Sequence, residues 1–469
     1  MALKDAQLAS VCEIANVAQF VSFNDALEQR HSALRGNEPN KACGSLEDAA
    51  DALLKAAGGS VNVRTFHPEL DKNLPFHYGL TKSQDVVNTV KRSAADGLYT
   101  IINETIDIHD GGVSGVFFGT LAEFAPDDTP RCVDKPGTVA LDWSRAVRFF
   151  ESVFELEVDR FPFNDATKRV EFSVHPRRCG YRHERLICWE IESFDSVHES
   201  VAETHWPNRL SRKLGDKAFG LLVASVSGLP VPRTQVVPRT MPPFSFGEAT
   251  GVGEKWLRTC PSTPEPGKYA TVQGWVDPFR FMTMEDADGS AIPSLLIQDG
   301  VEAQYSGALA MTRAGAITIE GVRGLGDRFM LGQAVREVLP APIRADVEGL
   351  ARSAAGLMGS VRAEWVHDGE TAWVVQLHHS ATSSRPGVIV PGKRDKWVDF
   401  DPEDGLDNLR EMLRRTDRKT TGIVVTKPVG VTSHVGDLIR RARVPAVVLS
   451  PSQGLQESLF DADDSDGSQ

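Results

Sequence analysis

One histidine near the C-terminal end of the chain lies between two hydroxyl residues and a helical pattern. The stretch GVTSHVGDLIRRARVPAV covers residues 430–447, places His434 directly after Thr432 and Ser433, and follows the apolar run GIVVTKP. Neutral imidazole can attack phosphorus, and it is abundant near neutral pH because its unperturbed pKa is about 6.5. N–H groups at a helix start and nearby hydroxyls would hold the phosphoryl group, and Gly430 would allow a tight turn. The pattern predicts a phosphate-carrying histidine, with a capping or buried histidine as the alternative.

Residues suited to binding a nucleoside triphosphate lie upstream of this stretch. Lys217 stands at a predicted helix start in LGDKAFG, and Arg258 stands in LRTCPSTPEPGKY. A lysine binds phosphate as a point charge, whereas an arginine binds it through two parallel N–H groups. Glu364 and Gln376 could each present an oxygen to one Mg²⁺ ion, which prefers hard oxygen ligands. Taken singly, each residue has an ordinary alternative as a solvated charge, a surface ion pair or the polar face of a strand.

Alternating helix and strand patterns would bring these residues together. Lys217 begins a helical pattern that ends at Gly228, and the run WLRTC, which holds Arg258, is typical of a strand. The segment VRAEWVHDGETAWVVQL predicts two antiparallel strands joined by the turn HDGE, which places Glu364 and Gln376 on neighbouring strands. Further strand patterns fill the segments 294–311 and 316–333.

The N-terminal part of the chain shows a similar mixture. We expect one helical pattern from Leu3 to about Leu34, with a break, and another from Leu46 to Ala57 with Ser45 as its N-cap. The strand patterns that follow repeat an order found in the second half: a strand with arginine, one ending in an acidic or amide pair, one beginning with Ser-Gly, one with glutamate, and two paired strands. The segments are VNVRTF, IINETIDI, VSGVFFG, LAEFAP, RVEFSVH and ICWEIE against WLRTC, LLIQDGV, YSGALAM, ITIEGV, VRAEW and WVVQL. A duplication is one explanation, and chance likeness between short apolar strands is the other.

Composition excludes several classes of protein. Of 469 residues, 41% are hydrophobic and 25% charged, which is typical of globular domains. A formal net charge of −13 disfavours nucleic-acid or anionic-membrane partners. No apolar run approaches a membrane span, the N-terminus lacks the order of a signal peptide, and the six cysteines form no CxxC pair. We expect a cytoplasmic protein with reduced thiols.

In combination, the segments between about residues 207 and 452 resemble the phosphoenolpyruvate synthase, pyruvate phosphate dikinase and rifampin phosphotransferase family. LGDKAFGLLVASVSGLPVP is similar to that family's GGKGANLAEL…GLPVPPGF, and WLRTCPSTPEPGKYATV to its VRSS…EDLP…AGQ. SLLIQDGVEAQYSGAL resembles VQEMV…SGVLFT, and ITIEGVRGLGD resembles E…GLGE. RAEWVHDGETAWVVQLHHS is similar to the paired IEW…LQ-R strands, and the His434 stretch to GG-TSHAAIVAREL-GIPAV.

The resemblance implies ATP and Mg²⁺ as cofactors and gives each motif a role. Lys217 and Arg258 would bind phosphate, Glu320 would lie beside the nucleotide, and Glu364 and Gln376 would hold the metal. The adenine would be gripped at Gln298, Asp299 and Val301. His434 would be phosphorylated, with AMP and inorganic phosphate as products. The chain departs from the family where Thr259 and Cys260 replace serines, where His378 replaces an arginine, and where VGDLIR replaces AAIVAR.

These observations predict an α/β (α+β) fold with several domains. An ATP-grasp domain would be joined to a small swivelling phosphohistidine-like domain and preceded by a mixed α/β domain, either acceptor-binding or a degenerate ATP-grasp lobe. The predicted bounds are 1–205 for the N-terminal domain, 206–382 for the ATP-grasp domain, 383–405 for a linker, 406–455 for the swivelling domain and 456–469 for a disordered acidic tail.

The predicted activity is an ATP-dependent phosphotransferase of the dikinase type. It would move a phosphoryl group from ATP through phosphohistidine to a small-molecule acceptor, and a homodimer is left open. Histidines of the first 205 residues, alongside Arg64, Asp107, Asp110 and Glu171, could form the acceptor pocket or a metal site, although packed roles are the simpler interpretation. Two alternatives stay open: an ATP-grasp ligase that forms an acyl phosphate, and a non-catalytic nucleotide-binding regulator.

Overall fold

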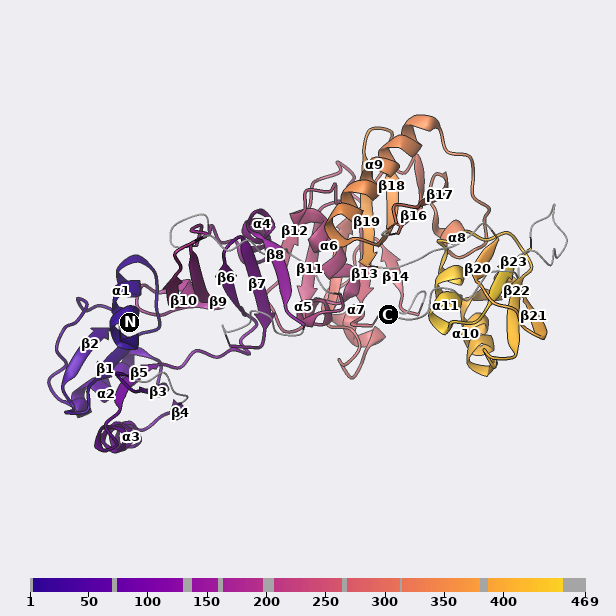
Figure 1. The fold of residues 1–469 in the computed structure, drawn as a ribbon. Coiled ribbons are helices and arrows are strands. Elements are labelled where there is room, and N and C mark those ends of the chain that lie inside the picture. The colour runs from indigo at the N-terminus through magenta and orange to yellow at the C-terminus, as the bar shows by residue number, and fades with distance from the viewer. Residues whose placement is uncertain are drawn as a thin grey trace. The chain divides into compact units, whose positions relative to one another are not determined.

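A computed structural model of the chain describes residues 3–69, 74–129, 137–158, 163–196, 206–263, 268–312, 314–379 and 387–449. The chain forms two compact units, one of Met1–Leu210 with Thr240–Pro242 and one of Ser211–Arg239 with Pro243–Gln469 (Figure 1). The division falls at Leu210, whereas the sequence placed a boundary near residue 205. Both units mix helices with mainly antiparallel sheets, which confirms the predicted α+β class.

The first unit begins with a five-stranded sheet in the order β2-β1-β5-β3-β4. Its elements are α1 (Lys4–Ile14), β1 (Phe20–Phe23), β2 (Gln29–Ala33), α2 (Leu46–Ala56), β3 (Val61–Phe66), β4 (Phe76–Leu80), α3 (Ser83–Ala95) and β5 (Tyr99–Glu104). Ser45 caps α2 through a capping box with Asp48, which confirms that helix start. The helix expected to run to about Leu34 is wrong beyond Ile14. The apolar run around Val21 instead forms a fully buried strand, which β2 and β5 flank on either side.

A second five-stranded sheet completes the first unit, in the order β10-β9-β6-β7-β8. Its elements are β6 (Val113–Phe118), β7 (Leu121–Pro126), β8 (Val139–Asp142), α4 (Trp143–Phe154), β9 (Lys168–Cys179) and β10 (Glu184–Ser193). Phenylalanines of the sheet and of α4 pack with ring centroids 4.6 to 6.4 Å apart, from Phe124 against Phe149 to Phe150 against Phe154. Such contacts bury large apolar areas, so α4 is fixed to this sheet.

The second unit also begins with a five-stranded sheet, in the order β12-β11-β15-β13-β14. Its elements are α5 (Arg209–Leu214), α6 (Asp216–Val226), β11 (Thr234–Pro238), β12 (Phe244–Phe246), β13 (Lys255–Cys260), β14 (Thr271–Gln273), α7 (Pro278–Glu285) and β15 (Ser294–Asp299). Helix α6 is apolar on nearly every side and buried along nearly its whole length. A helix of this kind lies inside a domain rather than on its surface, so the residues at its start are held firmly.

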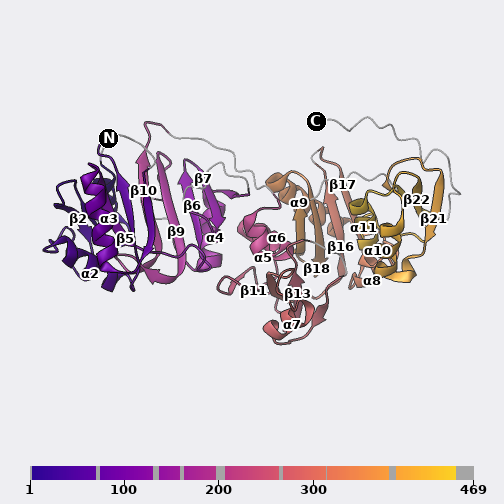
Figure 2. The same ribbon diagram turned by 90° about the horizontal axis from the view of Figure 1, so that it is seen from below.

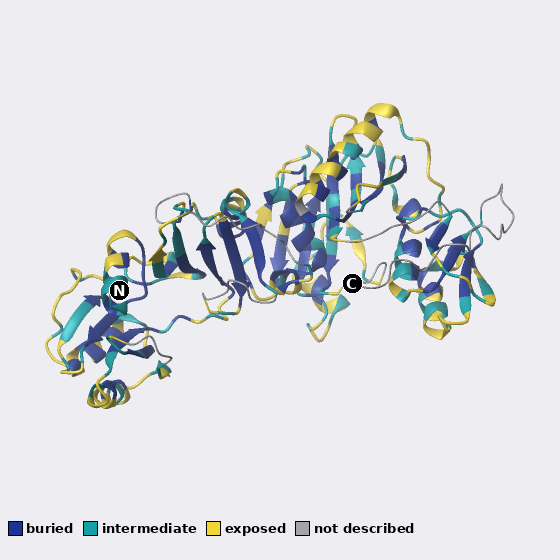
Figure 3. Cartoon of the chain, in the orientation of Figure 1, coloured by how far each residue is buried: buried dark blue, intermediate teal, exposed yellow. Residues whose placement is uncertain are grey.

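A four-stranded sheet follows in the second unit, in the order β17-β16-β18-β19. Its elements are β16 (Tyr305–Met311), β17 (Ile317–Arg323), α8 (Asp327–Met330), α9 (Ala341–Met358), β18 (Val361–His367) and β19 (Ala372–His379). Helix α9 packs on this sheet with one buried and one exposed side (Figure 3). The turn between β18 and β19 lies where the letters HDGE predicted it.

The last part of the second unit is a small module, here called the C-terminal module (387–449). Its elements are β20 (Val388–Val390), β21 (Lys396–Phe400), the 3₁₀ turn η1 (Pro402–Asp404), α10 (Gly405–Arg415), β22 (Thr421–Val425), α11 (His434–Ala442) and β23 (Ala446–Val448). The sheet order is β20-β23-β22-β21, with β21, β22 and β23 parallel, and α10 and α11 pack against each other (Figure 2).

The expected linker 383–405 is therefore largely part of this module. Strands β20 and β21 lie within residues 383–405 and are packed into the module. Val388 of β20 is buried. The Trp397 ring of β21 covers Gly422 of β22, where a Cβ would come within 2.5 Å of the ring. The Pro, Gly and charged residues around these short strands are typical of a linker, so the sequence did not predict the strands. Residues 383–386 of the linker and the predicted acidic tail lie outside the described residues. Within the described ranges, no helix combines the length and the apolar character needed to cross a membrane.

The two units repeat one topology. The order β2-β1-β5-β3-β4 corresponds to β12-β11-β15-β13-β14, and β10-β9-β6-β7 corresponds to β19-β18-β16-β17. The register repeats too, since Val116 lies opposite Glu123 and Glu171, and Ala308 lies opposite Glu320 and Glu364. Seven pairs of polar residues occupy the same position in the strand pairing of the two units. With the residue of the first unit given first, they are Arg64 and Arg258, Asn103 and Gln298, Glu104 and Asp299, Glu123 and Glu320, Arg169 and Arg362, Glu171 and Glu364, and Glu190 and Gln376.

This agreement extends to an irregularity. The pairing of β9 with β10 shifts register between Cys188 and Glu190, and the pairing of β18 with β19 shifts beside Glu364 at the equivalent place. Such bulges are specific features of a sheet rather than accidents of composition. The repeated strand order and the repeated bulge support an internal duplication over chance likeness between short strands.

Candidate active site

The second unit contains a cavity of about 480 Å³, lined by residues from both of its first two sheets, from α6 and from α11. Most of the residues singled out from the sequence line it. They are Lys217, Arg258, Gln298, Asp299, Val301, Glu364, Gln376 and His434. Glu320 does not line the cavity, and its position is described below. This volume suits a ligand of nucleotide size, which ordinary binding cavities of a few hundred Å³ accommodate.

Lys217 enters the cavity from the first turn of α6. The helix starts at Gly215, whose φ is +81° and where a Cβ would come within 2.0 Å of the Cys260 carbonyl oxygen. Only glycine fits such a close approach, and the Asp216 N–H donates to the Pro261 carbonyl at 3.1 Å. Burial, with a contribution from the charge of Arg258, lowers the pKa of Lys217 to about 8. Below this pH the buried lysine is charged, and a bound anion such as phosphate would stabilise that charge.

We expect the affinity for ATP to fall as pH rises through about 8. The charged ammonium binds phosphate and the neutral amine does not, so the loss follows the titration of Lys217 in the free protein. Calorimetric titration with ATP between pH 7.5 and 9.5 should show a roughly tenfold weakening, the scale of one charge-assisted hydrogen bond. The Lys217→Met variant should show weak binding without this step. A wild-type affinity that stays flat across the range would contradict contact between Lys217 and phosphate.

Arg258 holds together the two candidate metal ligands. Its guanidinium donates to the Val375 carbonyl at 2.8 Å and to the Gln376 side-chain oxygen, and it lies 3.5 Å from a Glu364 carboxylate oxygen. Burial is the largest single effect on Glu364 and opposes its ionisation, but the charge of Arg258 together with other positive neighbours keeps the pKa of this carboxyl below its ordinary value. Glu364 and Gln376 are direct partners in the β18–β19 register, so both oxygens face the same space.

A hydrogen-bonded chain that sequence reasoning missed supports this group. The Gln376 amide bonds to Nε2 of His378, and Nδ1 of His378 bonds to the Asp216 carboxylate. The arrangement fits a neutral ring with its proton on Nδ1, which fixes the Gln376 amide so that its oxygen faces Arg258. His378 replaces the arginine of the resembled family, and its spacing of two residues from Gln376 on one strand was the available signal.

The end of β15 forms another wall of the cavity. Gln298 is buried and its amide donates to the Thr234 hydroxyl at 3.2 Å, while Asp299 forms an ion pair with Lys255. Val301 and the aromatic rings of Trp256 and Tyr269 also line the cavity. A planar base would find apolar faces and backbone polar groups here, which are the features that bind an adenine ring.

His434 reaches the same cavity from the C-terminal module. It is the first residue of α11, and the Ser433 side chain caps the helix by accepting a hydrogen bond from the Gly436 N–H at 3.4 Å. Burial lowers the pKa of His434 to about 4, against the opposing effect of Glu364. The ring is therefore neutral at physiological pH and has a lone pair available for attack.

Thr432, a neighbour of His434, has a role other than the one expected. Its hydroxyl, predicted as a donor to phosphate, donates instead to a Glu320 carboxylate oxygen at 2.7 Å. Gly430 begins a tight turn as expected, since its carbonyl accepts the Ser433 N–H at 3.0 Å, and a Cβ there would come within 2.7 Å of the Phe329 ring and 2.9 Å of that same Glu320 oxygen. Glu320, expected beside the nucleotide, thus contacts the histidine loop.

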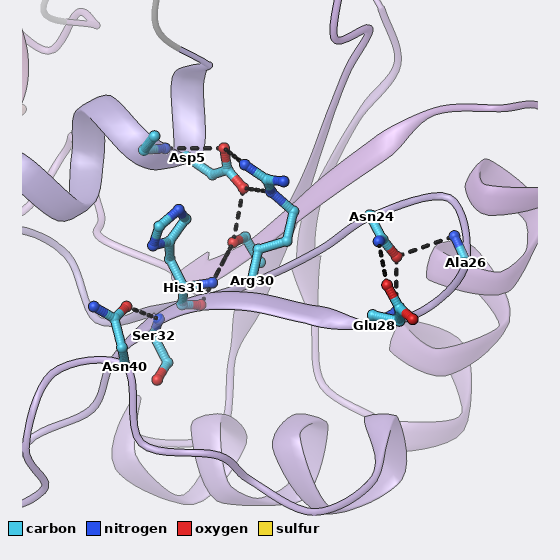
Figure 4. Close-up of polar contacts among 10 residues, drawn as sticks. Asp5, Asn24, Ala26, Glu28, Arg30, His31, Ser32 and Asn40 are labelled. Atoms are coloured by element: carbon cyan, nitrogen blue, oxygen red, sulfur yellow. Dashed lines mark hydrogen bonds and ion pairs between the residues drawn. The ribbon is translucent and has the colours of Figure 1, made fainter.

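In the first unit, the corresponding place is nearly closed. A recess of about 20 Å³ is lined by Lys4, Arg64, Trp189 and Glu190 among others. At the start of α1, Asp5 is fully buried and paired with Arg30 at 2.6 Å (Figure 4). The first unit therefore offers a far smaller space than the cavity of the second unit.

Several of the N-terminal residues suggested for an acceptor or metal site are packed in the first unit. His175 bonds to Asp110 at 2.9 Å and to the Ser173 hydroxyl at 2.7 Å, and Trp189 donates to the same hydroxyl at 2.7 Å. Glu171 forms an ion pair with Arg169 at 2.8 Å. Across the described ranges, no group of three or more His, Cys, Asp and Glu side chains is arranged to hold a metal ion. An acceptor pocket in this unit stays a hypothesis.

Comparisons with known proteins give limited information. No protein-family model matches the chain, and no curated protein matches it. Among solved structures, D-alanine–D-alanine ligase from Bacillus anthracis complexed with ATP matches at 13% identity and a TM-score of 0.26, over 36% of this chain and 55% of that one. The ATP-grasp RimK domain protein from Sphaerobacter thermophilus matches at 18% identity and a TM-score of 0.23, over 36% of this chain and 58% of that one.

A third match is the macrocyclase MdnB from Microcystis aeruginosa, at 12% identity and a TM-score of 0.23, over 50% of this chain and 88% of that one. The chain spans about half the length of the D-alanine–D-alanine ligases that it matches. With TM-scores this low, the likeness carries no conclusion about the fold or the activity of this chain.

Proposed function

We propose that this protein is an ATP-dependent phosphotransferase. The second unit would bind ATP in an ATP-grasp manner and pass a phosphoryl group to His434, which would deliver it to a small-molecule acceptor. The supporting observation is that the neutral His434 ring lines the same cavity as Lys217, Arg258 and Glu364. A nucleophile, two phosphate-binding cations and an oxygen ligand thus share one space, as phosphoryl transfer requires.

Each residue has a defined part in this proposal. Lys217 and Arg258 bind phosphate oxygens and stabilise the charge that develops on them, and His434 attacks phosphorus with an imidazole nitrogen. The wall at Gln298, Asp299 and Val301 receives the adenine. The oxygens of Glu364 and Gln376 fit a Mg²⁺ ion, since both are hard donors that face one space, and this ion would neutralise phosphate charge when bound.

The products follow from the positions of the phosphorus atoms. If AMP and inorganic phosphate leave, AMP takes the α-phosphorus and inorganic phosphate takes the γ-phosphorus. The group that stays on His434 then contains the β-phosphorus. An imidazole nitrogen forms a bond to the β-phosphorus while the bond from that phosphorus to the oxygen of AMP breaks, which leaves a pyrophosphoryl group on His434. Water then attacks the γ-phosphorus and breaks its bond to the oxygen that bridges the two phosphorus atoms, so inorganic phosphate leaves and one phosphoryl group stays on His434.

An ATP-grasp ligase is the second candidate. The matched structures are named as ligases, an ATP-grasp RimK domain protein and a macrocyclase, and one ligase is described as complexed with ATP. A cavity with Lys217 and Arg258 would serve an acyl phosphate equally well, and His434 would then be dispensable. A regulator that binds nucleotide without turnover would use the cavity alone.

Product analysis separates these candidates. The protein is incubated with ATP, Mg²⁺ and a metabolite extract, and nucleotides are separated by chromatography. The phosphotransferase forms AMP and inorganic phosphate, whereas a ligase forms ADP and a regulator forms neither. Formation of ADP without AMP would overturn the proposal in favour of the ligase. Mass spectrometry of the same mixture would identify the phosphorylated acceptor.

A further inference from the structure

Glu320 makes a buried polar contact between the C-terminal module and the rest of the second unit. It lies on β17 with only 3% of its surface exposed. One of its carboxylate oxygens accepts the Thr432 N–H at 2.9 Å and the Thr432 hydroxyl at 2.7 Å. Two donors on one charged oxygen make a strong and directional contact, and it lies two residues before His434.

Arg362 holds the other side of the same loop. It lies on β18 with 6% of its surface exposed, and its guanidinium is 2.8 Å from an Asp437 carboxylate oxygen. The same guanidinium donates to the Thr432 carbonyl. Burial is the largest single effect on Asp437 and opposes its ionisation, but the charges of Arg362, Arg441 and Arg440 together keep its pKa below the ordinary value. Arg362 thus binds the chain on both sides of His434.

The register places both residues on one face of the sheet. Glu320 lies opposite Ala308 of β16, and Arg362 lies opposite Ala310, two residues along the same strand. Residues two apart on a strand share a face, and Glu364 also lies opposite Ala308. The face that presents Glu364 to the cavity therefore presents Glu320 and Arg362 to the histidine loop.

The loop fits this face closely. Gly430 lies so near the Phe329 ring and Glu320 that an added methyl group would overlap both. A Cβ at Gly332, after α8, would come within 3.1 Å of side-chain atoms of Val429 and Val435. Close packing as well as charge therefore determines where the C-terminal module lies against β17 and α8.

A contact built on buried charge differs from an apolar interface. Buried ion pairs add little net stability, because desolvation offsets their attraction, but they fix one geometry. Water can also replace them when the surfaces part, which suits a contact that forms and breaks. Glu320 and Arg362 are therefore better suited to positioning His434 than to stabilising the fold.

We propose that Glu320 and Arg362 are positioning residues that dock the C-terminal module through Thr432 and Asp437 and so present the His434 ring to the cavity. The effect on phosphoryl transfer rests on the proposed function, whereas docking itself is measurable without it. Glu320 does not line the cavity, so its loss should change the transfer rate rather than the binding of nucleotide; Arg362 also lines the cavity, so the test is made on Glu320.

The test compares Glu320→Ala and Glu320→Gln with the full-length wild type. Hydrogen exchange is followed by mass spectrometry on peptides covering 429–437, and His434 phosphorylation from ATP is timed in parallel. Glu320→Ala should speed exchange about tenfold or more and slow phosphorylation about 10- to 100-fold, the scale of one or two charge-assisted hydrogen bonds. The KM for ATP should stay within twofold. Glu320→Gln keeps an acceptor oxygen and should restore most of the rate.

Two further variants address folding and specificity. Gly430→Ala keeps every polar group but adds a methyl group between Phe329 and Glu320, so it should loosen docking even if Glu320→Ala folds poorly. Glu370→Ala removes an exposed carboxylate in the β18–β19 turn of the same sheet and should behave as wild type.

The outcomes separate this proposal from the proposed function. Unchanged exchange and unchanged transfer in both Glu320→Ala and Gly430→Ala would overturn it. Faster exchange in these variants, with no phosphohistidine in the wild type, would leave the docking contact standing and remove the carrier chemistry. A raised KM for ATP with normal exchange would instead place Glu320 at the nucleotide, as the sequence alone suggested.

Discussion

Replacing His434 by alanine is expected to abolish phosphoryl transfer while ATP still binds. The ring supplies the attacking nitrogen, and no other group at the start of α11 can form the same bond to phosphorus. Its removal leaves Lys217, Arg258 and the adenine wall in place, because they belong to α6, β13 and β15. AMP formation should fall by at least about 1,000-fold, as losses of a covalent nucleophile usually do. The Kd for ATP should change by less than about threefold.

A matched control is available on the same unit. His379 is an exposed histidine at the end of β19, and His379→Ala should keep wild-type AMP formation. Nucleotide binding is measured by calorimetry and AMP by chromatography. Wild-type AMP formation in His434→Ala would contradict the carrier role, and loss of ATP binding in that variant would show that the ring acts in the binding step instead.

Replacing Lys217 by methionine is expected to weaken ATP binding by about 100-fold. Methionine keeps the length and the apolar stem of lysine but loses the charge that binds phosphate. The site already disfavours the charged form, since burial lowers the pKa of Lys217 to about 8, so the fold should tolerate the change. The loss corresponds to one or two charge-assisted hydrogen bonds to phosphate oxygens. Calorimetric titration with ATP in the presence of Mg²⁺ measures it.

The duplicated first unit supplies the control for this variant. Lys4 begins α1 and lines the small recess together with Arg64 and Glu190. Because that recess is only about 20 Å³, Lys4→Met should change ATP affinity by less than twofold. Equal effects of the two substitutions would indicate a nucleotide site in the first unit and contradict the present assignment.

The residues that the sequence located best are those fixed by local pattern. The HDGE turn joins two antiparallel strands, so Glu364 and Gln376 lie on neighbouring strands as predicted. Lys217 was predicted at a helix start, and the helix does begin one residue before it. Gly215, two residues before Lys217, allows the close approach of the chain at this start. Such features depend on a few neighbouring residues, so a sequence pattern can express them.

The features that the sequence did not predict depend on contacts between residues that are far apart in the chain. Nothing near Glu320 in the sequence indicates that Thr432 will cover it, so its contact with the histidine loop could not be predicted. The residues from Phe20 to Ala33 looked helical, but β1 pairs with β5 and β2 pairs with β1, which makes these two segments strands. The strand at Lys396 was hidden by the surrounding charge, and its pairing with β22 comes from the fold of the module.

Labelling with ATP that carries ³²P at the β-position shows whether His434 carries a phosphoryl group. The protein is incubated with this ATP and Mg²⁺, denatured, and digested for peptide mapping by mass spectrometry. If phosphoryl transfer passes through His434, the peptide that contains this residue will carry an acid-labile, base-stable label. The label will form together with AMP and will be absent from His434→Ala. A label unchanged in His434→Ala, or AMP formed with no labelled protein at any time, would contradict transfer through this histidine.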